Sequence, residues 1–147
     1  MKKYFQIFIV LILTLAFKSY ATESVTKTDQ LYQSGLQAIE RDDYETAISL
    51  LEQAVKADPT KADHHRWLAR AYGLQVEHAP WYSQMGLAKK ARASFEKAVE
   101  VEPENIDALL DLRSFYDQAP AIVGGSKEKA EVISKKLKLS GYDSDQK

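Results

Sequence analysis

Residues 28–61 read TDQLYQSGLQAIERDDYETAISLLEQAVKADPTK, and the spacing of small residues in this stretch decides the fold. Gly35 is followed by Ala47 after twelve residues, by Ala54 after seven more and by Pro59 after a further five. Small and apolar residues at helical spacing place one packing stripe on each of two consecutive helices. The stretch therefore predicts a pair of helices that approach each other closely.

The second helix of this pair carries start and stop signals. Asp42 or Asp43 is placed to accept hydrogen bonds from the free N–H groups of its first turn. Asp58-Pro59 ends it, because proline cannot continue a helix.

The same pattern recurs in residues 62–105. Its marks are Leu68, Ala69 and Tyr72 in a first helix and Ala91, Phe95, Ala98 and Pro103 in a second. Ten additional residues separate the two helices, since Ala69 to Ala91 spans 22 residues where Gly35 to Ala47 spans 12. This second unit is therefore predicted to be a lengthened hairpin.

The insertion has a predicted course. We expect the first helix to run on toward Glu77, Ala79-Pro80 to break it, and Ser83 to cap a lengthened second helix.

A third unit occupies residues 106–141, with Leu109, Leu112 and Tyr116 on its first helix and a divergent second helix from Lys127 to Leu139. The connecting segment 119–126, APAIVGGS, is predicted to be a turn. Ile122 and Val123 are expected to pack into the core, the glycines to allow positive backbone angles, and Ser126 to cap the last helix.

These spacings resemble those of the tetratricopeptide-repeat superfamily, in three units that together cover 28–141. The resemblance implies an all-α fold, in which three helical hairpins stack as a short right-handed superhelix, an α-solenoid, with the second hairpin lengthened. It further implies a non-enzymatic scaffold that binds proteins or peptides on its concave face and has no cofactor or metal of its own.

The N-terminus has the pattern of a secretory signal peptide over residues 1–21. Two lysines precede an apolar run of about 13 residues, too short for a membrane-spanning helix of about 20 residues, and Ser19-Tyr20-Ala21 provides a cleavage site. Cleavage would leave a linker, 22–27, the repeat domain and a polar, flexible tail, 142–147. We expect an exported bacterial protein, periplasmic or extracellular, that does not insert stably into a membrane after cleavage.

Composition excludes several classes of function. The 147 residues carry 20 basic and 21 acidic side chains, and this balance gives no electrostatic footprint for nucleic acid. The absence of cysteine removes disulfides, thiolate metal sites and a cysteine nucleophile.

The first helix of each unit lines the concave face of such a stack, so residues off its packing stripe are candidates for partner binding. They are Tyr32, Leu36 and Ile39 in the first unit, Arg66 and Arg70 in the second, and Leu110, Ser114 and Asp117 in the third. The first three form a possible apolar floor, or are covered by the next unit.

Arg66 and Arg70 lie four residues apart, on one face of a helix, and could together hold a carboxylate of a bound peptide. Alternatively they form solvent-exposed pairs with acidic neighbours, namely Asp63, Asp107 or Asp111. Trp67 is expected to pack between units.

The insertion, 73–87, adds two more candidates, Trp81 and Tyr82. Exposed on a loop, they would be a recognition edge; folded back, Trp81 would seal the ends of the lengthened helices.

The function predicted from these features is that of a cell-envelope adaptor, and two alternatives stay open. One is a self-associating structural module, a homo-oligomer in which another copy or the tail fills the groove. The other is a small metal-dependent enzyme around His78 with His64 or His65, of which at most one could meet His78, since adjacent residues diverge by roughly 100° around a helix.

Overall fold

The computed structural model describes residues 27–142, and all regular structure within that range is helical. The elements are a helix over 27–40, α2 (Tyr44–Ala57), α3 (Ala62–His78), α4 (Trp81–Val101), α5 (Ile106–Gln118), a short 3₁₀ helix η1 (Ala121–Val123) and α6 (Lys127–Leu139). The predicted signal peptide, 1–21, lies outside the described residues, as do 22–26 of the linker and 143–147 of the tail.

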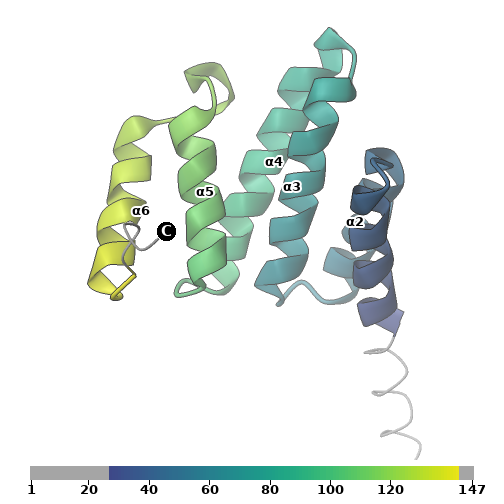
Figure 1. Ribbon diagram of the computed structural model, residues 1–147, viewed down its shortest axis with the longest axis horizontal. Helices are drawn as coiled ribbons and strands as arrows, with labels where there is room; N and C mark the ends of the chain where they lie inside the picture. The colour runs from purple at the N-terminus through teal and green to yellow at the C-terminus, as the bar shows by residue number, and fades with distance from the viewer. Residues whose placement is uncertain (1–26, 143–147) are drawn as a thin grey trace, which may run out of the picture.

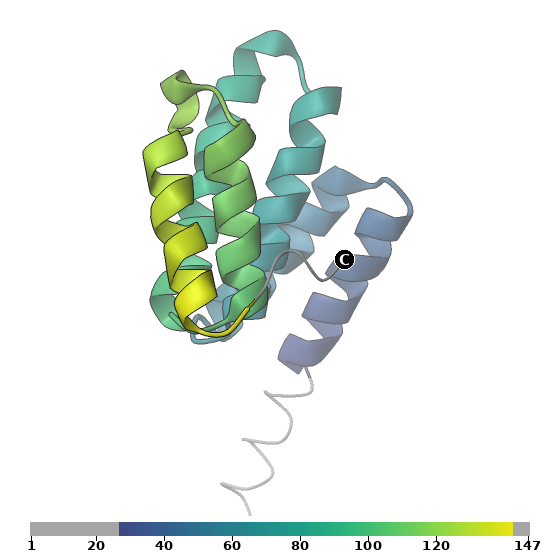
Figure 2. The ribbon, with the colours of Figure 1, turned by 60° about the vertical axis from the view of Figure 1, so that its left-hand side comes forward.

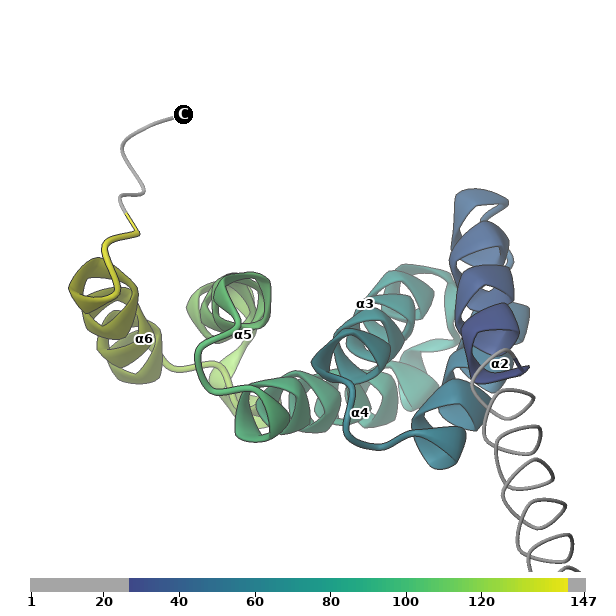
Figure 3. The same ribbon diagram turned by 90° about the horizontal axis from the view of Figure 1, so that it is seen from below.

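The helices form three hairpins, 27–40 with α2, α3 with α4, and α5 with α6, stacked side by side (Figure 1). The stack curves, with α3 and α5 on its inner side and α4 on its outer side (Figure 3). Besides the hairpin partners, α2 packs against α3, and α5 packs against both α4 and α3. The all-α fold of stacked hairpins is thereby confirmed.

The second hairpin is lengthened, as the insertion predicts. α3 has 17 residues against 13 in α5, and α4 has 21 against 14 in α2. The added turns project beyond the neighbouring hairpins (Figures 1 and 2). The insertion thus extends both helices and does not form a separate loop.

The predicted cap at Ser83 is wrong. α4 begins at Trp81, with Pro80 in the capping position and no side-chain cap. The Pro80 carbonyl accepts a hydrogen bond from the Ser83 amide at 2.8 Å, so Ser83 already lies within the first turn. The fixed φ of proline, here −55°, starts the helix two residues before the nearest capping side chain.

The other predicted caps are confirmed. The Asp43 carboxylate accepts from the Thr46 amide at the start of α2, and hydrogen bonding by the Thr46 side chain and amide lowers the pKa of Asp43. The Ser126 hydroxyl accepts from the Lys129 amide at the start of α6.

The turn between α5 and α6 differs from expectation at two residues, since Ile122 does not enter the core and Gly125, unlike Gly124, does not have a positive φ. Val123 is buried, but Ile122 is 69% exposed, because the single 3₁₀ turn points only one of the two side chains inward. Gly124 has the predicted positive φ, 101°. At Gly125 a Cβ atom would lie 1.7 Å from the Ala119 carbonyl oxygen, so only glycine fits there.

Equivalent hydrogen bonds occur at the two interfaces between hairpins, at positions 44 residues apart in the sequence. The Tyr72 hydroxyl donates to Glu52, and the Tyr116 hydroxyl donates to Glu96 at 2.7 Å. Each bond joins the first helix of one unit to the second helix of the unit before. Burial, assisted by the accepting carboxylate, raises the pKa of both tyrosines above the ordinary value.

These raised pKa values predict a loss of stability in alkali. Tyrosine ionises near pH 10 in the unfolded chain but only at higher pH in the fold. The contribution of the two neutral tyrosines to the free energy of unfolding is therefore complete below pH 10 and disappears as the pH rises further. In the variant Tyr72→Phe with Tyr116→Phe, each lost bond should cost about 1 kcal/mol at neutral pH. Urea unfolding on both sides of pH 10 should show a smaller alkaline decrease in this variant than in the parent chain; equal decreases would contradict the account.

None of the described helices is long and apolar enough to cross a membrane.

Candidate functional site

The two candidate arginines belong to an ion-pair network that joins α3 to α5. Arg70 donates two hydrogen bonds to Asp111, from Nε at 2.8 Å and from Nη2 at 2.7 Å. Arg66 lies 3.1 Å from Asp63, 3.4 Å from Asp107 and 3.6 Å from Asp111. Hydrogen bonding to Asp111 raises the pKa of Arg70 above its ordinary value.

The network contains all three acidic neighbours named as alternative partners, and it is only partly solvent-exposed. The side chains of Arg66 and Asp111 are 11% and 16% exposed, whereas those of Arg70, Asp63 and Asp107 are 37%, 53% and 66% exposed. Trp67 packs against the core beside them, and the Arg70 guanidinium lies 4.8 Å from the centre of its ring. Binding of a partner's carboxylate by these arginines stays a prediction, and such a partner would have to compete with Asp111.

The candidates of the first unit are partly covered, and Tyr32 lies against the second unit. Tyr32, Leu36 and Ile39 are all half-buried. The Tyr32 ring lies 5.0 Å from the ring of His64 on α3, and Ile39 packs against a core cluster that includes Leu51. For Tyr32 this favours the interpretation that the next unit covers it.

The candidates of the third unit separate from one another. Leu110 is half-buried between α5 and α6. Asp117 forms an ion pair with Lys127 at 2.7 Å, which ties the end of α5 to the start of α6. Ser114 alone of the three lines a cavity next to α3.

That cavity has a volume of about 460 Å³ and is lined by residues of α3, α4 and α5. We call it the α3–α5 groove. Its lining comprises Gly73, Val76 and Glu77 of α3, Ala88, Ala91 and Phe95 of α4, Asp111, Ser114, Phe115 and Gln118 of α5, and Ala119, Pro120 and Val123 beyond it.

Sequence reasoning missed most of this groove. It opens where α3 and α4 extend past the ion-pair network, so the difference in hairpin length creates it. Small residues, Gly73, Ala88 and Ala91, leave space in the groove unfilled, and two phenylalanines, Phe95 and Phe115, form its apolar floor with ring centres 6.1 Å apart. The ten-residue insertion was a signal for the groove, because helices of unequal length cannot cover one another completely.

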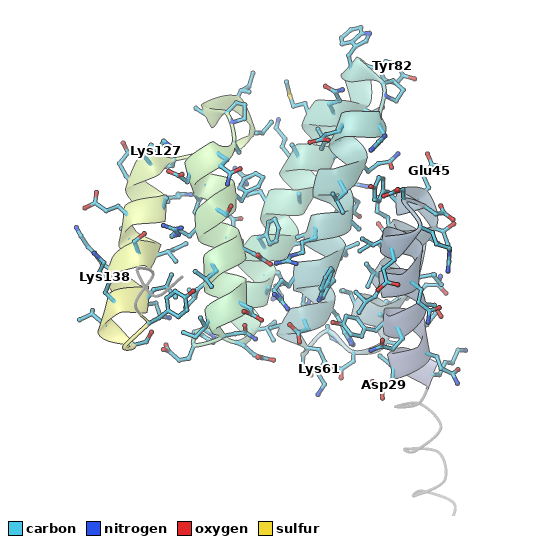
Figure 4. The ribbon with its side chains drawn as sticks, viewed as in Figure 1. Asp29, Glu45, Lys61, Tyr82, Lys127 and Lys138 are labelled. Atoms are coloured by element: carbon cyan, nitrogen blue, oxygen red, sulfur yellow. The ribbon has the colours of Figure 1, made fainter. Side chains whose placement is uncertain are left out.

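The aromatic residues of the insertion are exposed. Trp81 is 83% exposed and Tyr82 71%, with their rings edge to face at 5.9 Å. Tyr82 points away from the end of the α3–α4 hairpin (Figure 4). The alternative in which Trp81 folds back to seal the helices is therefore wrong; as the first residue of α4, Trp81 projects outward from the turn.

The histidines do not converge. His64 and His65 are buried near the start of α3 and bond different backbone carbonyls, those of Asp58 and Pro59. His78, at the other end of α3, lies about 20 Å away along the helix axis and packs against Tyr44. Residues 27–142 hold no group of three His, Asp or Glu side chains placed to bind a metal ion. A shared metal at His78 and either of the others is therefore wrong for this fold.

Comparisons with known proteins agree with this architecture. The family described as "Tetratricopeptide repeat" matches residues 31–61 and 82–105, that is, the first unit and most of α4 with the turn after it. No curated protein matches the chain.

Among solved structures, the TPR domain of OM64 from Arabidopsis is similar, with a TM-score of 0.54 and 16% sequence identity over 80% of this chain and 98% of that one. At this identity the likeness shows the fold. Tetratricopeptide repeats generally mediate protein–protein interactions, and such domains are typically non-enzymatic binding modules. The two matched segments and the three stacked hairpins together support the tetratricopeptide-repeat superfamily for this chain.

Proposed function

We propose that this protein is an adaptor that binds a protein or peptide segment in the α3–α5 groove. The observation that carries the proposal is a cavity between α3 and α5 whose lining includes the buried Phe95 and the half-buried Phe115. Its volume of about 460 Å³ falls within the range of about 300–1,000 Å³ that is usual for ligand pockets.

Polar groups at the rim would orient the bound segment. Glu77 stands on the α3 side, and Ser114 and Gln118 stand on the α5 side, where the Gln118 amide donates to the Ser114 hydroxyl at 2.7 Å. An apolar anchor on a floor with a few polar groups around it is the usual composition of a binding pocket. The network of Arg66, Arg70 and Asp111 holds α3 and α5 at a fixed separation below the groove, and so pre-organises it.

We propose further that the adaptor works in a bacterial cell envelope or outside the cell. The support is the signal-peptide pattern of residues 1–21, with Lys2 and Lys3 before the apolar run and a small-x-small end at Ala21. N-terminal sequencing of the protein recovered from the periplasm would test this, with Thr22 expected as the first residue.

The groove is tested by filling it. Ala88→Trp places an indole between α3 and α5, whereas Ala93→Trp makes the same change on the same helix at an exposed position outside the groove. In pull-downs from envelope extract with residues 22–147, the parent chain and Ala93→Trp should retain a common partner that Ala88→Trp loses. Circular dichroism should show equal helicity in all three.

Two results would overturn the proposal: a partner that Ala88→Trp retains as well as Ala93→Trp does, or no partner for the parent chain beyond the chain itself. The second result would favour the self-associating module.

A further inference from the structure

We propose that the end of the α3–α4 hairpin binds the interfacial region of a lipid bilayer through Trp81, Tyr82 and Met85, which we call the aromatic tip. Trp81 and Met85 are one helical turn apart on α4, and Met85 is 43% exposed beside the more exposed rings. Tryptophan and tyrosine have an apolar body and a polar N–H or O–H end, the chemistry that concentrates these residues at membrane–water interfaces.

The distribution of charge around the tip fits a membrane surface. Residues 79–88, APWYSQMGLA, carry no charged side chain, and the exposed Lys89 and Lys90 follow directly. At 1.5 Å per residue, Lys89 lies about 12 Å along α4 from Trp81. Interfacial segments bury their apolar face by about 5–10 Å, so buried rings would place the two ammonium groups at the level of the lipid headgroups.

The segment around the tip carries more basic than acidic side chains. Over residues 74–92, Glu77 is the one acidic side chain, whereas Lys89, Lys90 and Arg92 are basic. Lys90 lies over the Tyr72 ring at 5.2 Å, and Arg92 lies 3.8 Å from Glu96. An anionic leaflet would therefore attract this end of the molecule, while a zwitterionic one would bind the rings alone.

The shape of the tip favours lipid over a protein surface. Two aromatic side chains bury about 150–250 Å² each, so the rings offer at most about 500 Å², whereas a stable protein interface needs about 800 Å² from each partner. The tip projects beyond the neighbouring hairpins (Figures 1 and 4), and a convex projection can enter a bilayer interface without a matching pocket. Because no described helix could span a membrane, the contact would be peripheral.

The contact is separate from the proposed peptide site. Neither Trp81 nor Tyr82 lines the α3–α5 groove, which begins about two helical turns after Trp81 along α4, at Ala88. Lipid binding and peptide binding can therefore fail independently.

Fluorescence provides a direct test, since the chain has only two tryptophans. Trp67→Phe leaves Trp81 as the sole reporter, exposed to water in the free protein. With phosphatidylglycerol vesicles its emission should shift to the blue, and lipids brominated on the acyl chains should quench it.

Cosedimentation with the same vesicles measures the affinity. Trp81→Ser with Tyr82→Ser should lower the partition coefficient by about tenfold or more, because it removes two buried rings. Val132→Ser, which removes a 66% exposed apolar side chain from α6, is the matched control and should leave it unchanged. Lys89→Gln with Lys90→Gln should lower the partition coefficient about fivefold per lysine on phosphatidylglycerol vesicles and leave it unchanged on phosphatidylcholine vesicles.

Three results would overturn the inference. The first is that vesicles do not change the emission of Trp81, and the second is that the blue shift appears without vesicles when the protein concentration is raised. The third is that the tip variant, Trp81→Ser with Tyr82→Ser, partitions onto vesicles as well as Val132→Ser does. The second result would assign the tip to another copy of the chain. The groove variant Ala88→Trp should still bind vesicles, which separates this test from that of the adaptor function.

Discussion

Replacing Leu51 by alanine is expected to lower the free energy of unfolding by about 2–5 kcal/mol, the usual cost of removing a fully buried leucine. Leu51 has no exposed surface and lies in the cluster that joins the first hairpin to the second. The cavity would open beside Gly35, on the opposite helix, where the Leu51 side chain takes the space that a Cβ atom would need. Urea unfolding followed by circular dichroism measures the change.

The close approach of Gly35 and Leu51 makes a second substitution informative. A Cβ atom on Gly35 would lie 2.7 Å from Leu51 Cγ, so Gly35→Ala alone should destabilise the fold by overpacking. In the Leu51→Ala background the same change should become neutral or stabilising, because it fills space and removes a glycine from a helix interior. Additive losses in the double variant would contradict the packing described here.

The second large effect is expected at Asp111. Asp111→Ala removes both hydrogen bonds of Arg70 and one of the three carboxylates around the buried Arg66, with an expected loss of about 3 kcal/mol. Asp107→Ala is the matched control, since its carboxylate also faces Arg66 but its side chain is 66% exposed. The ion pair of Asp107 with Arg66 should contribute no more than about 1 kcal/mol to the free energy of unfolding.

Thermal or urea unfolding should show a larger loss of stability for Asp111→Ala than for Asp107→Ala. Because Asp111 also lines the groove, its loss should weaken partner binding as well, through a less constrained separation of α3 and α5. Equal stability of the Asp111 and Asp107 variants would show that the network does not fasten the two helices together.

The sequence was sufficient for the fold because each hairpin repeats its packing stripe. Ala47, Leu51 and Ala54 lie on the buried face of α2, and the equivalent Ala91, Phe95 and Ala98 lie on the buried face of α4. Local start signals, Asp43 and Ser126, cap the predicted helices with hydrogen bonds to their first turns.

The binding surface was less accessible to sequence reasoning, because it depends on pairs of helices. Whether Arg66 faces solvent or acidic side chains depends on α5, which lies about 40 residues away in the chain. The insertion was expected to lengthen both helices, but whether Trp81 is exposed or folded back was open in the same way. The existence of the α3–α5 groove likewise depends on how the lengthened helices pack against α5.

The Ser83 and Ile122 predictions failed for local reasons. Pro80 could start α4 without a capping side chain, and one 3₁₀ turn could bury Val123 but not its neighbour. In both cases the residue types allow more than one turn geometry, so the sequence alone does not determine which one forms.

The central claim is that a protein partner lies in the α3–α5 groove, and hydrogen exchange of the partner complex tests it most directly. Binding should slow exchange of the amides in 73–77, 88–95 and 111–118, the three segments that line the groove, and leave α6 unchanged. Protection confined to α6 or to the first hairpin, with none in these three segments, would contradict the account.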